Sequence, residues 1–188
     1  MNNNTVFQKL DEFHLPDDFR GRSSVMVQLW WLVQDTLFRW SPQFMYGWRR
    51  FLLRIFGAKI GQMVLIRPSV RVTYPWKVTI NDFSWIGDDV VLYSLDEIHI
   101  GAHTVISQKS YICTGSHDFT HRNFKIFGLP IHIGNQVWIA SDNFIAPGVS
   151  IGDGCIVGAR STVLNDLPPA MICYGNPARP MKPRPRSE

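Results

Sequence analysis

The chain has 188 residues, of which 45% are hydrophobic, 13% aromatic and 18% charged. This length and composition are typical of one folded domain with a sizeable core, and they exclude a disordered or collagen-like chain. The formal net charge of +4 favours anionic ligands but does not by itself indicate nucleic acid binding. Three cysteines are too few for a disulfide framework, so we expect a reducing compartment: Cys113, Cys155 and Cys173.

The first 58 residues divide into a polar arm, residues 1–22, and a predicted helical hairpin, residues 23–58. Residues 25–40 are apolar at eleven of sixteen positions, but polar residues interrupt them, and a bilayer span needs about 20 apolar residues. Ser41-Pro42 then predicts the N-cap and first position of a second helix. Helical spacing places the apolar residues of this second helix on one face and its arginines on the other: Phe44, Trp48, Phe51, Leu52 and Ile55 against Arg49, Arg50 and Arg54.

Two roles fit this hairpin. It can cap the end of the structure that follows, or residues 25–56 can make a peripheral membrane contact, because basic, aromatic-rich amphipathic helices lie well in the headgroup layer. Both roles are compatible if each helix serves one of them.

After residue 59 an aliphatic residue recurs at every sixth position in four blocks. The positions are Ile60, Ile66, Val72 and Val78; Ile80, Ile86, Leu92 and Ile98; Ile100, Ile106 and Ile112; and Ile133, Ile139, Ile145, Ile151, Val157 and Val163. A period of six fits neither a helix nor a flat strand, but it is typical of a parallel β-helix in which three hexads close one triangular coil. We therefore predict a mainly β protein with about five coils over residues 59–168 and a short C-terminal tail, residues 169–188.

The repeat lapses between Ile112 and Ile133. An eighteen-residue coil that starts at Ile100 ends at His117, so residues 118–132 are predicted to leave the coil as an excursion loop. Long loops in compact folds are usually functional.

Several segments resemble the hexapeptide acyltransferases: TGSHDF at 114–119, VWIA at 137–140, GVSIGDG at 148–154, VGARS at 157–161 and GNPARP at 175–180. With the helical hairpin, VQLWWLVQDTLFRWSPQ at 27–43 and FLLRIFGAKIG at 51–61 narrow the resemblance to the colanic acid biosynthesis acetyltransferase group. The resemblance implies a left-handed parallel β-helix, acetyl-CoA as co-substrate, and a homotrimer whose active sites lie between subunits.

The resemblance also implies roles for single residues. His117 falls where the superfamily keeps its catalytic base. Trp138, Ala140 and Ser141 fall where the pantetheine channel lies, and CoA contacts on the next coil would be Ala159, Leu164 and Asn165. Arg179 and Lys182 match tail positions that meet CoA phosphates, and two more cations follow them, Arg184 and Arg186. The galactoside enzymes keep an asparagine about thirty residues before the histidine, where this chain has Gly87, so we expect its acceptor to be positioned differently.

Transfer from a thioester to an alcohol needs a base, and a histidine is largely neutral near pH 7. Asp118, Asp96 and Glu97 are candidates for orienting its ring, although an adjacent aspartate more often faces solvent. His121 is a loop residue or a weak candidate for acceptor contact. No covalent intermediate is needed, so no cysteine is assigned a catalytic role.

Two other functions remain open at this point. One is a zinc enzyme similar to the γ-type carbonic anhydrases, with His117 and His121 joined by His99 or His103. The other is a non-catalytic trimeric scaffold. The GNPARP tail favours the CoA enzyme over the zinc enzyme.

The sequence therefore favours an O-acetyltransferase that moves acetyl from acetyl-CoA to a sugar hydroxyl in exopolysaccharide synthesis, by direct transfer in a ternary complex. The acceptor would be a nucleotide sugar or a lipid-linked oligosaccharide. We expect no metal and no nucleic acid partner. The expected location is the cytoplasm, with a peripheral position at the inner membrane if the hairpin binds lipid.

Overall fold

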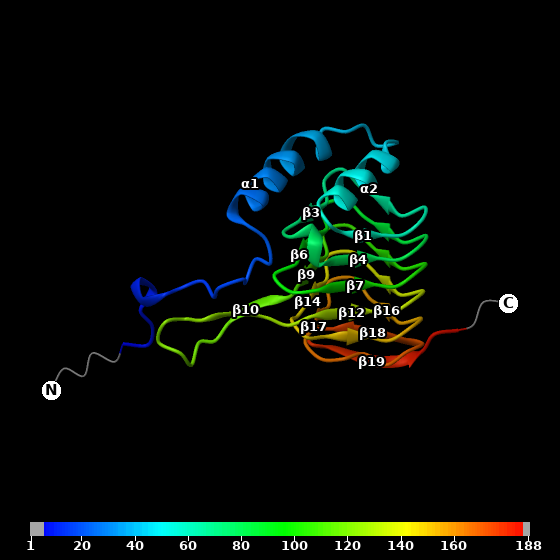
Figure 1. Ribbon diagram of the computed structural model, residues 1–188. Helices are drawn as coiled ribbons and strands as arrows, with labels where there is room; N and C mark the ends of the chain where they lie inside the picture. Colours follow the sequence, from blue (N-terminus) through cyan, green and yellow to red (C-terminus); the bar gives the residue numbers. More distant parts are fainter. Residues whose placement is uncertain (1–5, 186–188) are drawn as a thin grey trace.

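The computed structural model describes residues 6–185 and consists of a parallel β-helix with two helices across one end (Figure 1). The predicted fold class, a mainly β solenoid with an N-terminal helical hairpin, is confirmed. Arg186 and the first five residues of the predicted arm lie outside the described residues. The solenoid has five full coils and the beginning of a sixth, one more than the repeat predicted, because Leu167 bridges to Ile151 and the chain then adds a further strand.

Three sheets form the faces of the prism. Face A contains β1 (Lys59–Ile60), β4 (Val78–Ile80), β7 (Ile98–Ile100), β12 (Ile131–Ile133) and β15 (Ser150–Ile151). Face B contains β2 (Leu65–Ile66), β5 (Trp85–Ile86), β8 (Val105–Ile106), β13 (Trp138–Ile139), β16 (Ile156–Val157), β18 (Met171–Gly175) and the antiparallel β19 (Ala178–Pro183). Face C contains β3 (Arg71–Val72), β6 (Val91–Tyr93), β9 (Tyr111–Cys113), β14 (Phe144–Ile145) and β17 (Thr162–Val163).

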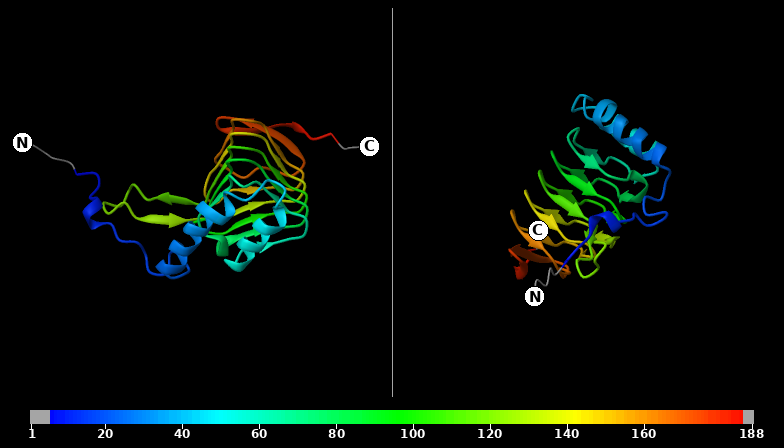
Figure 2. Two further views of the ribbon diagram at one scale, coloured as in Figure 1. Left: turned by 90° about the horizontal axis from the view of Figure 1, so that it is seen from above. Right: turned by 90° about the vertical axis from the view of Figure 1, so that its left-hand side faces the viewer.

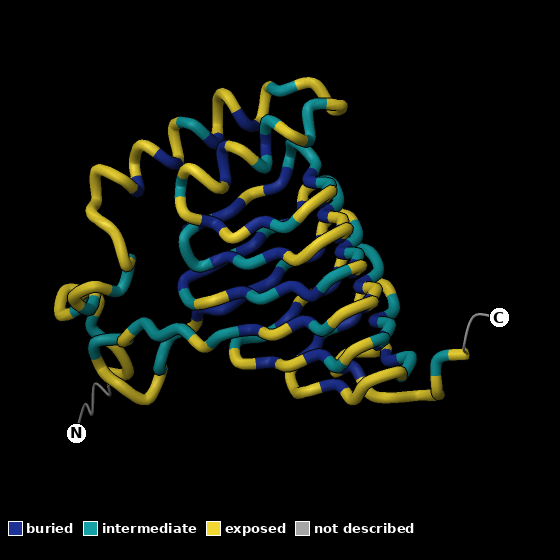
Figure 3. Tube along the Cα trace, turned by 45° about the vertical axis from the view of Figure 1, so that its right-hand side comes forward, coloured by how far each residue is buried: buried dark blue, intermediate teal, exposed yellow. Residues whose placement is uncertain are grey.

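The period of six produces the core. On face B, Ile66, Ile86, Ile106 and Ile139 follow one another in register, and all are buried. The residue before each of them points outward, because side chains alternate along a strand. The core is thus a column of stacked aliphatic side chains, and Figure 3 shows buried positions recurring on successive coils.

The helical cap, residues 23–58, consists of α1 (Ser24–Val33), a π-helical turn η2 (Gln34–Phe38) and α2 (Tyr46–Ile55). Ser23 caps α1 by accepting a hydrogen bond from the Met26 N–H. The predicted N-cap at Ser41 is wrong, since α2 begins five residues later and the Ser41 hydroxyl binds Arg49 instead. No helix among the described residues is long and apolar enough to cross a membrane.

The second helix is rotated about its axis relative to the expected amphipathic orientation, although Leu52 of the expected apolar face is buried as predicted. The face that meets the solenoid carries Arg49, Leu52 and Leu53, whereas Phe51 and Ile55 are exposed. Arg49 is fully buried, and its guanidinium donates to the carbonyls of Ile66 (2.6 Å), Pro42 and Gln43 and to the Ser41 hydroxyl.

These contacts follow from the open end of the β-helix. Every coil pairs its backbone with the next coil, so the first coil has no neighbour on its outer side and its backbone groups there need other partners. Side chains of the cap supply them. The pairs are Arg54 with Ile60 and Gly61 oxygens, Arg50 with the Val64 oxygen, Arg49 with the Ile66 oxygen, Trp30 with the Val72 oxygen, Trp31 with the Thr73 oxygen, and the Gln34 side chain with the Val72 N–H.

We predict that Arg49→Met lowers the free energy of unfolding by about 3 kcal/mol or more, because several buried acceptors lose their donor at once. Arg39→Met is the matched control, since Arg39 is exposed on the same cap. Scanning calorimetry of both variants measures the difference, and equal unfolding midpoints would contradict the capping role.

Candidate functional site

The predicted excursion is a β-hairpin. Strands β10 (Gly115–His117) and β11 (Ile126–Gly128) pair antiparallel and project from the corner between faces C and A (Figures 1 and 2). The chain returns to the solenoid at Ile131, so the hairpin occupies residues 115–128, whereas the lapse of the repeat predicted 118–132. Glycine is required at the hairpin base, because a Cβ on Gly115 would overlap Leu95 and one on Gly128 would overlap Asp96.

His117 lies at the end of β10 with its ring fixed on one side. Its Nδ1 is 2.8 Å from the Phe124 carbonyl oxygen, and its ring stacks on the Phe124 ring at 4.3 Å between centroids. A carbonyl oxygen only accepts, so Nδ1 carries the proton and Nε2 keeps a lone pair. Nε2 is therefore the atom that can take a proton from a substrate.

The carboxylates named as orienting candidates bind other groups. Asp118 accepts from the Thr120 N–H and hydroxyl, which lowers the pKa of its carboxyl, and it lies 3.6 Å from His121. Glu97 pairs with His99 at 2.8 Å, which lowers the pKa of Glu97. Asp96 accepts from the Glu97 N–H. The contact that orients His117 is thus a backbone carbonyl, which residue type alone could not reveal.

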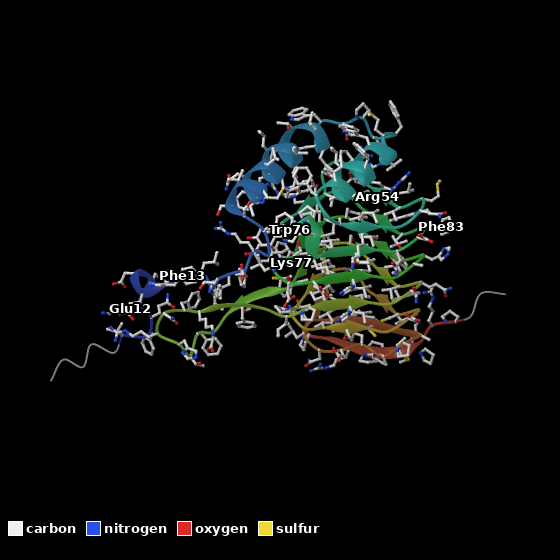
Figure 4. The ribbon with its side chains drawn as sticks, in the orientation of Figure 1. Glu12, Phe13, Arg54, Trp76, Lys77 and Phe83 are labelled. Atoms are coloured by element: carbon white, nitrogen blue, oxygen red, sulfur yellow. The ribbon has the colours of Figure 1, made fainter. Side chains whose placement is uncertain are left out.

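The N-terminal arm lies beside the hairpin. The Lys9 N–H donates to the Arg122 oxygen at 2.7 Å, and Glu12 lies 3.5 Å from the Arg122 guanidinium. This places the Phe13 ring 6.2 Å from the His117 ring (Figure 4). Sequence reasoning missed Phe13, because nothing in the pattern of the arm indicates where it folds back.

The root of the arm is tied to the solenoid by two residues that follow face C in the first coil. The Trp76 indole donates to the Arg20 oxygen at 2.7 Å, and the Lys77 ammonium donates to the Phe19 and Leu95 oxygens (Figure 4). Burial lowers the pKa of Lys77. Because Leu95 also packs under the hairpin base, Lys77 joins the arm to the segment that carries His117.

Most of the predicted coenzyme residues gather at a different corner, between faces B and C. Trp138, Ala140 and Ser141 are on one coil and Ala159 is on the next, and the coils are linked by the bond from the Arg160 N–H to the Ser141 oxygen. The Trp138 indole is half exposed and donates to the Ser107 hydroxyl at 3.1 Å.

Arg179 and Lys182 lie on the last strand of face B. A bulge in β19 makes Arg179 pair with Tyr174 and Lys182 pair with Ile172. Tyr174 and Ile172 are two residues apart and share the outward face, so both cations point outward as well. Without the extra residue in β19 they would be on opposite faces.

Leu164 and Asn165 are not part of this group. They follow face C and line a hollow of about 450 Å³ with Pro147, Gly148 and Asp166, at the corner from which the hairpin leaves. One chain therefore holds two separate sets of candidate residues: His117, Leu164 and Asn165 at one corner, and Trp138, Ala140, Ser141, Ala159 and Arg179 at another.

A groove of about 340 Å³ lies on the coils that precede Trp138, along face B and the corner between faces B and C. Trp85 forms its half-exposed aromatic wall, and Gly87 is among the residues that line it. At one side Arg67 binds Asp88 at 2.9 Å, which raises the pKa of Arg67, and the Arg67 guanidinium lowers the pKa of Tyr46. The sequence contained a signal for this groove, since Trp85 occupies the same outward hexad position as Trp138.

The histidines of the zinc alternative are dispersed. His117 and His121 are on the hairpin, His99 stacks against His132 on face A, and His103 stacks on Phe83. Within residues 6–185 no three His, Cys, Asp or Glu side chains are grouped as metal ligands. The geometry gives the zinc alternative no support.

Comparison with known proteins agrees with this architecture. Residues 130–165 match the bacterial transferase hexapeptide (six repeats) family. The chain is 59% identical, over 96% of its length and 100% of the relative, to the Escherichia coli K12 "Putative colanic acid biosynthesis acetyltransferase WcaF". The chain belongs to the hexapeptide-repeat acyltransferases, in the colanic acid biosynthesis acetyltransferase group.

More distant matches are also to proteins named as acetyltransferases. The galactoside O-acetyltransferase of Escherichia coli K12 is 30% identical over 70% of this chain and 66% of its own length. A maltose O-acetyltransferase from Clostridium difficile 630 superposes with a TM-score of 0.79 at 26% identity, covering 87% of this chain and 90% of that one. An acetyltransferase of Vibrio cholerae, solved with acetyl-CoA, shares the fold at 24% identity and a TM-score of 0.79, over 94% and 96% of the two chains.

We predict that the neutral imidazole of His117 is the Nδ1–H tautomer. The Phe124 carbonyl stabilises a proton on Nδ1 and leaves Nε2 unprotonated. Two-bond ¹⁵N–¹H correlation spectra of ¹⁵N-histidine-labelled protein, assigned by comparison with His117→Gln, report the tautomer directly. A ring protonated at Nε2 would contradict the geometry.

Proposed function

We propose that the protein transfers acetyl from acetyl-CoA to a sugar hydroxyl, with His117 as general base, in the synthesis of a colanic-acid-like exopolysaccharide. The observation that carries the proposal is the 2.8 Å contact between His117 Nδ1 and the Phe124 carbonyl oxygen, which leaves Nε2 as the ring nitrogen available for a substrate proton in a chain of this family. The near-complete match to the relative from Escherichia coli supports the reaction class and the pathway type.

The reaction needs no covalent enzyme intermediate. Nε2 of His117 removes the proton of the acceptor hydroxyl as its oxygen attacks the thioester carbonyl. The tetrahedral oxyanion then collapses to the ester, the carbon–sulfur bond breaks, and the imidazolium returns the proton to the CoA thiolate. The Phe124 carbonyl stabilises the imidazolium through Nδ1–H while the ring is charged.

Acetyl-CoA would lie along the corner between faces B and C. Trp138 gives an apolar wall for pantetheine, and the small residues Ala140, Ser141 and Ala159 leave room for it. The outward guanidinium of Arg179 and the ammonium of Lys182 are suited to the phosphates. The groove at Trp85 fits the sugar, since an aromatic face and the Arg67–Asp88 pair offer stacking and hydrogen bonds.

The two separate corners support a homotrimer with active sites between subunits. His117 of one subunit would face the coenzyme corner of its neighbour, because a repeated heterologous contact closes a ring. The proposed location is the cytoplasm, where acetyl-CoA is available. A nucleotide sugar or a lipid-linked oligosaccharide is the acceptor, and the latter would require work at the inner membrane.

His117→Ala should lower kcat for acetyl transfer by about 10²–10⁴-fold, the usual contribution of a general base, and leave the acetyl-CoA Kd unchanged. Release of CoA thiol with a nucleotide-sugar panel measures the first quantity, and calorimetric titration measures the second. Lys125→Ala, at an exposed position of the same hairpin, is the matched control and should retain activity. Full activity in His117→Ala would contradict the proposed base.

The inter-subunit site is tested by mixing two inactive variants. His117→Ala subunits and Trp138→Ala/Arg179→Ala subunits, co-expressed in equal amounts, should regain activity, since about a quarter of the interfaces would join two intact half-sites. Each variant expressed alone provides the baseline. If the site lay within one chain, every site in the mixture would carry a defect, and no activity would return.

A further inference from the structure

The helical cap has an outward face that is apolar on both helices. On α1, Val25, Leu29 and Leu32 are exposed at helical spacing, opposite the buried Val27 and Trp30. A helix that is apolar on both sides is usually covered on both sides. The solenoid covers only one side of this helix (Figures 1 and 3).

The apolar surface continues through the loop into the second helix. Trp40 is 82% exposed and Phe44 is 79% exposed, and Phe51 and Ile55 follow on the outer side of α2. The rotation of α2 explains the exposure of Phe51 and Ile55, since the side that carries Arg49 is used to cap the first coil. We call the whole surface the cap face; its members are Val25, Leu29, Leu32, Trp40, Phe44, Phe51 and Ile55.

Charge is concentrated in the same part of the chain. Residues 19–59 contain seven Lys and Arg residues and one acidic residue, Asp35, a formal charge of +6. The whole chain carries +4, so the remainder carries −2. Of these seven cations, Arg22, Arg39, Arg54 and Lys59 are exposed, whereas Arg49 is buried.

We propose that the cap face docks on the surface of an anionic lipid bilayer. Apolar and tryptophan side chains beside exposed basic residues are the composition that enters the headgroup boundary. The charge of +6 opposes the negative charge of such a surface, whereas the rest of the chain would be repelled. The helices lie on the membrane, since neither is long enough to cross it. This inference does not depend on the proposed acetyl transfer, and it accounts for access to a lipid-linked acceptor if that is the substrate.

Vesicle flotation with the full chain tests the inference. The wild type should float with vesicles of phosphatidylcholine and phosphatidylglycerol and bind much more weakly to phosphatidylcholine alone. Trp40→Ser/Phe44→Ser should lower the partition coefficient about tenfold or more, because two exposed aromatic side chains are lost. Arg22→Gln/Arg39→Gln should lower it about fivefold for each arginine and reduce its dependence on salt.

Phe7→Ser/Phe119→Ser is the matched control. These residues are 84% and 81% exposed but lie on the arm and the hairpin, away from the cap. The control should float like the wild type, and all variants should keep the wild-type unfolding midpoint. If Trp40→Ser/Phe44→Ser is destabilised, the single variant Leu32→Ser replaces it. Leu32 lies on α1 and is 62% exposed.

Three outcomes would overturn the inference. The wild type could remain in solution with both kinds of vesicle, or the control could lose binding as much as the cap variant. Third, light scattering without lipid could show that Trp40→Ser/Phe44→Ser forms smaller particles than the wild type does. The cap face would then be an interface between copies. Acetyl-CoA titration of the wild-type protein does not depend on any of these outcomes, so a failure here is distinguishable from a failure of the proposed enzyme.

Discussion

The unpaired edge of the first coil is the constraint on which the rest of this structure depends. A solenoid satisfies its backbone by stacking, and the stack must end somewhere. At this end, three arginines, two tryptophans and a glutamine of the cap take the place of a preceding coil. Buried Arg49 forms the centre of this arrangement, because one planar guanidinium reaches four acceptors in different directions.

This capping determines which side chains of the helical cap face solvent. The arginines of α2 bind backbone carbonyls of the first coil. Phe51 and Ile55, on another side of the same helix, therefore face solvent. α1 packs on the solenoid through Trp30, and the turn η2 that follows it is joined to α2 by the bond from the Trp48 indole to the Leu37 oxygen. The cap therefore closes the core and at the same time presents a basic, aromatic surface at one end of the prism.

The site depends on a different feature, the break in the third coil. The hairpin carries His117 away from the solenoid, and its own backbone fixes the imidazole through Phe124. The proposed coenzyme residues Ala140, Ser141 and Ala159 lie on the solenoid, because hexad spacing stacks small residues at one corner. The arm, held by Lys77 and Trp76, then brings Phe13 toward the imidazole. The proposed base lies on the hairpin and the proposed coenzyme residues lie on the solenoid, so the two are built by different parts of the chain.

The sequence by itself determined the solenoid, the position of its break and the residue types of the site, because a period of six specifies which side chains face the core regardless of distant contacts. The tertiary structure decided the details that depend on what a surface meets. A helical pattern placed Arg49 opposite the apolar side of α2, but only the unpaired carbonyl of Ile66 determines that the arginine side packs inward. Arg179 and Lys182 are three residues apart, which would place them on opposite faces of a regular strand, and only the bulge in β19 brings them to one face. The partner of His117 was a backbone carbonyl seven residues away, and every residue carries such a carbonyl, so only the folded hairpin could select the one at Phe124.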